Sequence, residues 1–345
     1  MRPEGGRPAG SGAGSGASAF PSGRQYEITF GRQSAILTEV GGALREYRQD
    51  GRNLLDGYRS EEMCTGARGQ SLIPWPNRIK SGSYVWEGRR LQLDLSEPDK
   101  GGAIHGLTRW RNWTVLSHAA DAISFTYTLH ACQGWPWVLD CRLDYQLGED
   151  GLSVRTTAVN RSPEPCPYGT GAHPYLSLGM AGGDGGSRDA ASRNPDGAQH
   201  NGTIDAGLVQ VPGRTFLPVD GRGIPTGQER VDGTGYDLKE LQQLGARHID
   251  VAYTDLLRDA DGRSRVRLVR PDRSAGVELW VDEAYPYLEI FTGDTLPQPD
   301  RRRAGLGVEP MTCAPDAFNS GEGLIRLQPG QSHTAVWGIN PNPDF

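Results

Sequence analysis

The chain has 345 residues, of which 48 are glycine and 24 are proline, and its formal net charge is −6 at pH 7. Glycine and proline both penalise helix interiors, so this composition excludes a mainly helical protein. The acidic balance argues against a nucleic-acid partner or an anionic membrane surface, and no run of 18 apolar residues predicts a membrane span.

The first segment in chain order, residues 1–24, is rich in Gly, Ala, Ser and Pro. It is too poor in apolar side chains to offset its own ordering entropy, so we expect a disordered tail. It also lacks the apolar stretch of a secretory signal. Five widely spaced cysteines form no CxxC motif, which favours reduced thiols in a cytoplasmic protein.

Residues 25–345 are predicted to form one domain. Apolar and polar residues alternate at 122–131 and 140–147, and Gly, Pro, Asn or Asp interrupts the pattern every 8–12 residues. Similar runs lie at 151–160, 264–271, 276–283 and 333–340. This pattern is typical of antiparallel strands and predicts an all-β fold, a large β-sandwich. Only residues 236–245 resemble a helix, ending at Gly245. The Gly/Asp-rich stretch 179–202 is interpreted as a solvated insertion or a mobile flap, and we favour the insertion.

Four segments place polar side chains at strand ends or turns beside Gly or Pro, where β-scaffolds present functional groups. The candidates are Asn77–Arg78 after a Pro-Trp-Pro turn, His105 before a glycine, His173 after Gly-Thr-Gly, and Glu309 before a proline.

Each candidate also has a purely structural interpretation: a hydrogen-bonded core histidine, a surface arginine or a carboxylate that ends a strand. Their co-occurrence favours function, and a lone carboxylate at the end of an apolar run suits a base with a raised pKa. Two histidines and a glutamate also suit a metal. No histidine pair has i, i+2 or i, i+4 spacing, so no metal is predicted.

Several blocks in the chain resemble the aldose 1-epimerase (galactose mutarotase) family. PWPNRIKSGSYVWEG is similar to its Asn-Arg-Ile block, AIHGL to its first His-Gly block and GTGAHPYLSLG to its second histidine block. VDGTGYDLKELQQLGARHIDVAYTD, YLEIFTGD and GVEPMTCAPDAFN resemble later blocks in the family's order. The resemblance spans about residues 25–340.

This resemblance implies a single β-supersandwich domain and an isomerase that interconverts the α and β anomers of a free aldohexose or aldopentose. It implies that Glu309 is the general base and His173 the general acid. His105, Arg78 and Asp250, with Asn77 of the same block, would bind the sugar. Asp255 competes with Asp250 for this role. One carboxylate and one imidazole suffice for the chemistry, so no metal or redox cofactor is implied.

The sequence leaves open two alternative functions and a role for three tryptophans. A hexose-6-phosphate epimerase of the same fold would need a basic clamp, for which Arg109, Arg111 and Arg301–Arg303 are available. A catalytically silent sugar-binding or regulatory protein is the other alternative. Trp75, Trp86 or Trp280 could stack on the sugar, although a core position is the simpler interpretation of each. We expect a monomer or homodimer.

Overall fold

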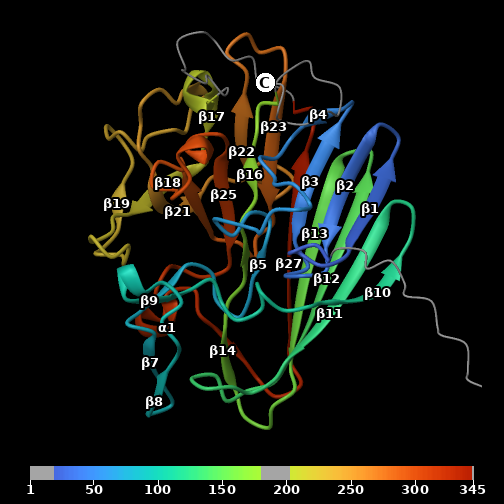
Figure 1. The fold of residues 1–345 in the computed structure, drawn as a ribbon. Coiled ribbons are helices and arrows are strands. Elements are labelled where there is room, and N and C mark those ends of the chain that lie inside the picture. Colours follow the sequence, from blue (N-terminus) through green and yellow to red (C-terminus); the bar gives the residue numbers. More distant parts are fainter. Residues whose placement is uncertain (1–18, 180–202, 344–345) are drawn as a thin grey trace, which may run out of the picture.

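The computed structural model describes residues 19–179 and 203–343. Their regular structure is almost entirely β-strand (Figure 1). Within these residues the only α-helix is α1 (Ala317–Ser320), and three 3-10 turns accompany it, η1 (Pro98–Lys100), η3 (Ile204–Ala206) and η4 (Pro299–Arg301). The predicted all-β class is therefore confirmed. No helix in the described ranges has the length and apolarity needed to cross a membrane.

The largest sheet has nine strands and forms one layer of the molecule. Its central strands follow the alternation predicted from the sequence. In β12, for example, Cys141, Leu143, Tyr145 and Leu147 are all buried. In spatial order the strands are β10 (Thr114–His118), β11 (Ala122–Leu129), β12 (Leu139–Gly148), β13 (Gly151–Asn160), β27 (Ser332–Asn340), β23 (Gly276–Val281), β22 (Ser264–Val269), β17 (Leu208–Gln210) and β20 (Gln242–Gln243).

A second sheet of eight strands carries Asp250 and Glu309 of the candidate site. Its main path is β19 (Glu229–Arg230), β18 (Gly213–Leu217), β21 (Asp250–Leu256), β24 (Tyr287–Phe291), β25 (Leu306–Met311), β15 (Gly171–Ala172) and β5 (Ser71–Leu72), and β16 (Tyr175–Leu176) also pairs with β25. The register places Asp250 opposite Phe291 and Glu289 opposite Glu309. Asp250 and Glu309 thus lie on the same sheet with β24 between their strands.

Smaller sheets surround these two. One contains β1 (Gln25–Phe30), β2 (Gln33–Thr38), β3 (Leu44–Gln49) and β4 (Arg52–Asn53). Three strand pairs complete the set: β6 (Arg78–Lys80) with β9 (Gly102–Ile104), β7 (Ser83–Trp86) with β8 (Arg89–Gln92), and β14 (Cys166–Tyr168) with β26 (Ile325–Leu327).

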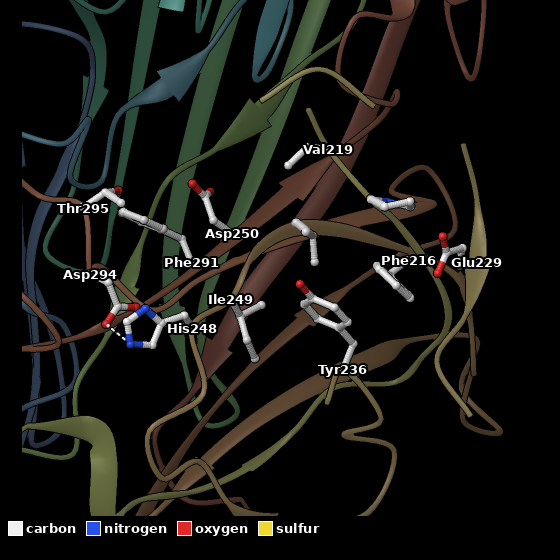
Figure 2. A pocket seen from close by; sticks show the side chains of 12 residues that line it. Phe216, Val219, Glu229, Tyr236, His248, Ile249, Asp250, Phe291, Asp294 and Thr295 are labelled. Carbon is white, nitrogen blue, oxygen red and sulfur yellow. Dashed lines mark ion pairs between the residues drawn. The ribbon is translucent and has the colours of Figure 1, made fainter. Parts of the chain in front are cut away.

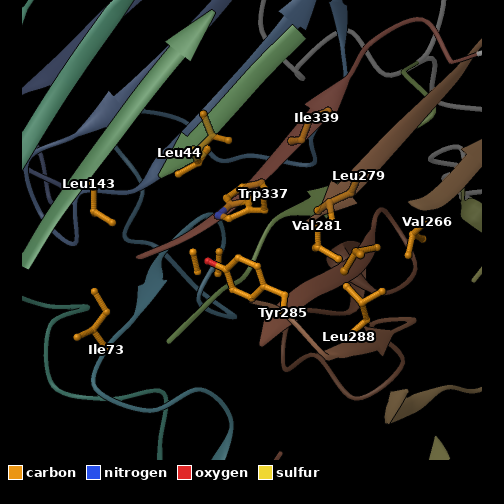
Figure 3. Packing of buried hydrophobic residues seen from close by; sticks show 14 of the residues in the cluster. Leu44, Ile73, Leu143, Val266, Leu279, Val281, Tyr285, Leu288, Trp337 and Ile339 are labelled. Carbon is orange, nitrogen blue, oxygen red and sulfur yellow. The ribbon is translucent and has the colours of Figure 1, made fainter. Parts of the chain in front are cut away.

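One large buried cluster joins the layers (Figure 3). Leu143, Leu279 and Trp337 contribute from the nine-stranded sheet, while Leu288 and Val308 contribute from the eight-stranded sheet. Burial of this apolar surface, at roughly 25 cal/mol per Å², stabilises the platform on which the site is built.

The predicted helix over residues 236–245 is wrong. This segment forms turns and the short strand β20, which pairs with β17 at the edge of the nine-stranded sheet. Leu238 and Leu244 are fully buried in the core cluster. An isolated helix of this length is marginal in water, and edge pairing together with burial of both leucines outweighs its helical propensity.

Two predicted segments lie mainly outside the described residues. For the proposed tail, residues 1–18 are outside, whereas 19–24 form a turn in which Ser22 is buried and accepts a backbone hydrogen bond from Val40. For the proposed insertion at 179–202, only Gly179 is described, and the chain resumes at Thr203 before η3.

Candidate active site

His173 and Glu309 form a buried pair on adjacent segments of the eight-stranded sheet. The His173 Nε2 and Glu309 Oε1 atoms are 3.0 Å apart, and both side chains are almost fully buried. The His173 ring stacks on Tyr175 with a centroid distance of 4.9 Å and an interplanar angle of 14°. The Tyr175 hydroxyl donates to the Gly66 carbonyl at 2.9 Å. The imidazole is therefore held in place against its carboxylate partner.

His105 lies on a strained loop that is fixed by backbone pairing. Its φ is +61°, and the next residue, Gly106, has a φ of +73°. A Cβ on Gly106 would lie 2.1 Å from the Ile73 carbonyl oxygen, so only glycine fits this close approach. The Asn77 backbone N–H donates to His105 Nδ1 at 3.2 Å. In the neutral ring this leaves the proton on Nε2, which can donate to a ligand. The two histidine rings are 5.2 Å apart.

Arg78 forms an ion pair with Glu97, a residue that the sequence analysis did not select. Its Nε and Nη2 atoms donate to Glu97 at 2.6 and 2.9 Å. Burial opposes the guanidinium charge, but Glu97, together with the charges of Asp250 and Glu289, outweighs burial and raises the pKa of Arg78. The bidentate pairing fixes the arginine at the cavity wall, where Nη1 is the nitrogen that Glu97 leaves unused.

Asp250, and not Asp255, lines the cavity. Asp250 lines the same cavity as His173 and Glu309 and is open to solvent through it. The surrounding protein still displaces enough water to raise its pKa, an effect that the charge of Arg78 opposes. Asp255 instead pairs with Arg214 and Arg230, away from the cavity lining. The structure thus brings together all six residues selected from the sequence: Asn77, Arg78, His105, His173, Asp250 and Glu309.

These six residues line one cavity of about 390 Å³. This is at the lower end of the roughly 300–1,000 Å³ range of small-molecule sites. Other lining residues include Cys64, Glu97, Arg109, Trp110, Tyr175 and Phe291. The cavity is therefore of small-molecule size and has both charged and aromatic walls.

The electrostatics of the buried pair favour its neutral forms. Burial raises the pKa of Glu309 well above its usual value, and the charge of Asp250 raises it further, while Arg78 and Arg109 oppose this. Burial, followed by the nearby Arg109 and Arg68, lowers the pKa of His173 to about 3. Burial also lowers the pKa of His105 well below its usual value. The histidines are therefore uncharged at neutral pH, and Glu309 is a stronger base than an exposed carboxylate.

The fold brings together three possible metal ligands that are far apart in the sequence. One ligand atom each from His105, His173 and Glu309 lies within 4.8 Å of the other two. A cation there would have to separate His173 Nε2 from Glu309 Oε1, which lie 3.0 Å apart. It would also lie near the guanidinium groups of Arg78 and Arg109, which line the same cavity. The arrangement suits proton transfer better than metal binding.

Sequence reasoning missed Glu289, although it lies in an apolar strand much as Glu309 does. It is buried opposite Glu309, and Asn77 Nδ2 donates to its Oε2 at 3.3 Å. Burial, then Asp250 and Glu309, raise the pKa of Glu289 well above its usual value. A search for lone carboxylates in apolar strands would have found both residues.

The tryptophan that lines the cavity is not one of the three named in the sequence analysis. Trp75 and Trp280 are buried, and Trp86 packs edge-on against Trp137 at 6.4 Å, so none of these three lines the cavity. Trp110, which is 52% exposed, lines it instead. Its place in the run TRWRNW carries no strong sequence signal.

Comparisons with known proteins agree with this architecture. A family model described as Aldose 1-epimerase matches residues 24–340. The chain is 30% identical to the uncharacterized protein YihR of Escherichia coli over 319 residues, covering 92% of this chain and 93% of YihR. It is 28% identical to galactose mutarotase of Homo sapiens over 199 residues, covering 55% of this chain and 50% of that protein.

Solved structures show the same fold at low sequence identity. A putative aldose 1-epimerase from Escherichia coli superimposes with a TM-score of 0.74 at 20% identity, covering 92% of this chain and 98% of the other. A galactose mutarotase-like protein from Clostridium acetobutylicum gives a TM-score of 0.75 at 18% identity, covering 91% and 93%. The chain belongs to the aldose 1-epimerase family.

Proposed function

We propose that this protein is an aldose 1-epimerase that interconverts the α and β anomers of a free aldose, with Glu309 and His173 as the catalytic residues. The observation that carries the proposal is the 3.0 Å contact between His173 Nε2 and Glu309 Oε1 at a cavity large enough for one sugar ring. A base and an acid of different chemical type stand side by side, as general acid–base catalysis requires.

The proton count of the pair suits the reaction. In the neutral pair Glu309 carries a carboxyl proton, and moving that proton from Glu309 Oε1 to His173 Nε2, 3.0 Å away, gives a carboxylate and an imidazolium. The carboxylate of Glu309 takes the proton from the anomeric hydroxyl while His173 protonates the ring oxygen. The C1–O5 bond breaks as the C1 carbonyl forms, and rotation about C1–C2 precedes closure on the other face. Closure reverses both transfers and regenerates the starting pair.

The remaining cavity residues would bind and orient the sugar. The His105 Nε2–H, the Arg78 guanidinium and the Asp250 carboxylate supply donors and an acceptor for hydroxyl groups. Asn77 would position two residues of the site, since its backbone N–H donates to His105 and its side chain donates to Glu289. Trp110 adds an aromatic surface for the apolar C–H face of the ring.

The charges in the cavity favour a neutral sugar over a phosphosugar. Of the arginines proposed for a phosphate clamp, only Arg109 lines the cavity. Arg301 binds Asp56 and Glu62, and Arg303 binds Asp205 and Asp294. Arg78 already pairs with Glu97, and Asp250 balances the charge of Arg109, so the lining offers a dianion no surplus of positive charge. The buried acid–base pair also argues against a silent binding protein.

An anomer-exchange assay tests this proposal. The rates of α/β exchange are measured by NMR or polarimetry for glucose, galactose, xylose, arabinose and a 6-phosphosugar, with and without protein. We expect acceleration for at least one neutral aldose and a smaller effect for the phosphosugar. Equal exchange rates with and without protein for every sugar would contradict the proposal. Preference for the phosphosugar would overturn the neutral substrate.

A further inference from the structure

Tyr175 connects His173 to a charged group that does not line the cavity. Its ring stacks on the imidazole of His173. Phe291, which lies beside Asp250 on the cavity wall (Figure 2), meets the same ring edge-on with a centroid distance of 6.3 Å. The ring also contacts the guanidinium of Arg68, whose Cζ atom is 4.6 Å from its centroid. Arg68 therefore reaches the proposed acid through a single aromatic ring.

Arg68 is a buried arginine with an incomplete set of partners. Only 2% of the residue is exposed. Its Nε atom donates to Asp56 Oδ2 at 3.2 Å, and its Nη1 atom donates to the Thr65 carbonyl at 3.0 Å. Among the residues that the structure describes, Nη2 has no hydrogen-bond partner. A buried donor without a partner costs stability, so packing alone does not account for an arginine at this position.

Asp56 ties this arginine to two walls of the cavity. Residues 63–67 and residues 295–298 both line the cavity. Asp56 Oδ1 accepts a hydrogen bond at 3.1 Å from Nη1 of Arg301, which follows the second of these segments. The Asp56 backbone N–H donates to the Tyr175 carbonyl at 2.9 Å. The aspartate thus holds both walls and the stacked ring together.

Arg68 also differs from the other groups around the His173 ring. The titratable groups there are Glu309, His105 and Tyr175, and the charged ones are Arg78, Arg109 and Arg68. All of them line the cavity except Arg68. After burial, the charges of Arg109 and Arg68 lower the pKa of His173 most. A positive charge beside an imidazolium makes it a stronger acid, which gives its proton to a sugar more readily.

We propose that Arg68 is a positioning residue for the general acid: its charge, held on the Tyr175 ring by Asp56, keeps His173 in place and favours release of its proton to the sugar. This inference rests on the proposed function, because that function makes His173 the acid. Since Arg68 does not line the cavity, it should affect the rate of the bound complex and not the affinity for the sugar.

Two changes separate the charge of Arg68 from its packing. Arg68→Lys keeps the positive charge but loses the planar fork that binds both Asp56 and Thr65. Arg68→Gln combined with Asp56→Asn removes both charges, and two amides can still hydrogen-bond to each other. Arg68→Met is a second charge-free variant, with the same expected result, that serves if the paired amides do not fold.

The measurement is anomer exchange by NMR over a range of concentrations of the aldose that the wild-type protein exchanges fastest. We expect Arg68→Lys to keep kcat within about threefold of wild type. The charge-free variant should lower kcat by about tenfold with KM within about twofold. Urea unfolding of each variant gives its stability. A purely structural role predicts instead that kcat follows stability in both variants.

Arg45→Gln is the matched control. Arg45 is also buried, pairs with Glu46 and donates to the Tyr58 carbonyl at 2.6 Å. It lies in β3 and outside the cavity lining. The control should lose stability and keep both kcat and KM within about twofold of wild type.

The outcomes separate this inference from the proposed function. A folded charge-free variant with kcat within about twofold of wild type would overturn the positioning role. A tenfold loss of kcat in Arg45→Gln, or a loss in Arg68→Lys as large as in the charge-free variant, would also overturn it. A rise in KM without a fall in kcat would do the same. A wild-type protein that accelerates exchange of no sugar would contradict the proposed function itself.

Discussion

Glu289 and Glu309 lie directly opposite each other on β24 and β25, and both carboxyl groups are buried. Burial raises the pKa of both groups well above the usual value, and the charges of Asp250 and Glu309 raise the pKa of Glu289 further. Asn77, which donates to Glu289, links this pair to the loop that carries His105. The arrangement makes Glu289 a positioning residue that acts on the site through Asn77, without having to touch the substrate.

The substitution Glu289→Gln should therefore leave the pH profile of anomer exchange in place. The charge of Glu309 raises the pKa of Glu289, so Glu289 stays protonated while Glu309 titrates, and glutamine removes no charge. Both limbs of the plot of kcat/KM against pH should keep their positions, because glutamine also keeps an oxygen for the Asn77 hydrogen bond. A Glu289→Gln profile displaced to lower pH would mean that Glu289 is ionised beside Glu309.

His173 and Arg78 should affect different kinetic parameters. His173→Asn removes the proposed proton donor and should lower kcat by about 10²–10⁴-fold with a smaller change in KM. Arg78→Ala should mainly raise KM, because the arginine binds ground state and transition state alike. Steady-state exchange rates over a range of sugar concentrations separate the two effects. A raised KM in His173→Asn together with a lowered kcat in Arg78→Ala would contradict both assigned roles.

The buried histidines should make the folded state sensitive to acid. The pKa of His173 is about 3 in the folded protein, below its ordinary value of 6.5, so the unfolded chain binds more protons between these values. The free energy of unfolding should therefore fall as pH drops from about 6.5 toward 3, by up to about 1.4 kcal/mol per pH unit for each such histidine. Urea unfolding at several pH values measures this slope, and His173→Asn should make it shallower. An unchanged slope in the variant would mean that His173 is charged in the folded protein.

Gly106 should be irreplaceable for steric reasons. Gly106→Ala combines a left-handed backbone with a Cβ 2.1 Å from the Ile73 carbonyl oxygen. We expect a loss of at least about 3 kcal/mol in the free energy of unfolding. Gly88→Ala is the matched control, since its φ is +77° but no heavy atom lies within 4 Å of the added Cβ, and it should cost about 1–2 kcal/mol. Equal losses in urea unfolding would refute the steric argument.

The strands were predictable where one face of a sheet is buried and the other is not. In β12 and β11 the alternation appears directly in the sequence. The wholly buried strands β23 and β25 carry less of this signal. The segment 236–245 was misread because its apolar spacing fits a helix, whereas long-range pairing with β17 decides its structure.

The candidate residues were predictable individually, but their partners were not. Glycine and proline punctuation marks the loops of His105 and His173, and the family resemblance selects Asp250. The partners Glu97 for Arg78 and Glu289 for Asn77 are separated from them by 19 and 212 residues. Contacts at such separations depend on sheet order and register, which no local pattern in one sequence specifies.

The most direct test of the account is the anomer-exchange rate of Glu309→Gln. Glutamine has nearly the shape of glutamate and cannot accept the anomeric proton. We expect an unchanged fold by circular dichroism, sugar affinity within about threefold of wild type, and a loss of exchange activity of at least about 10²-fold. A folded Glu309→Gln variant that exchanges anomers within about threefold of the wild-type rate would contradict the assignment of Glu309 as the base.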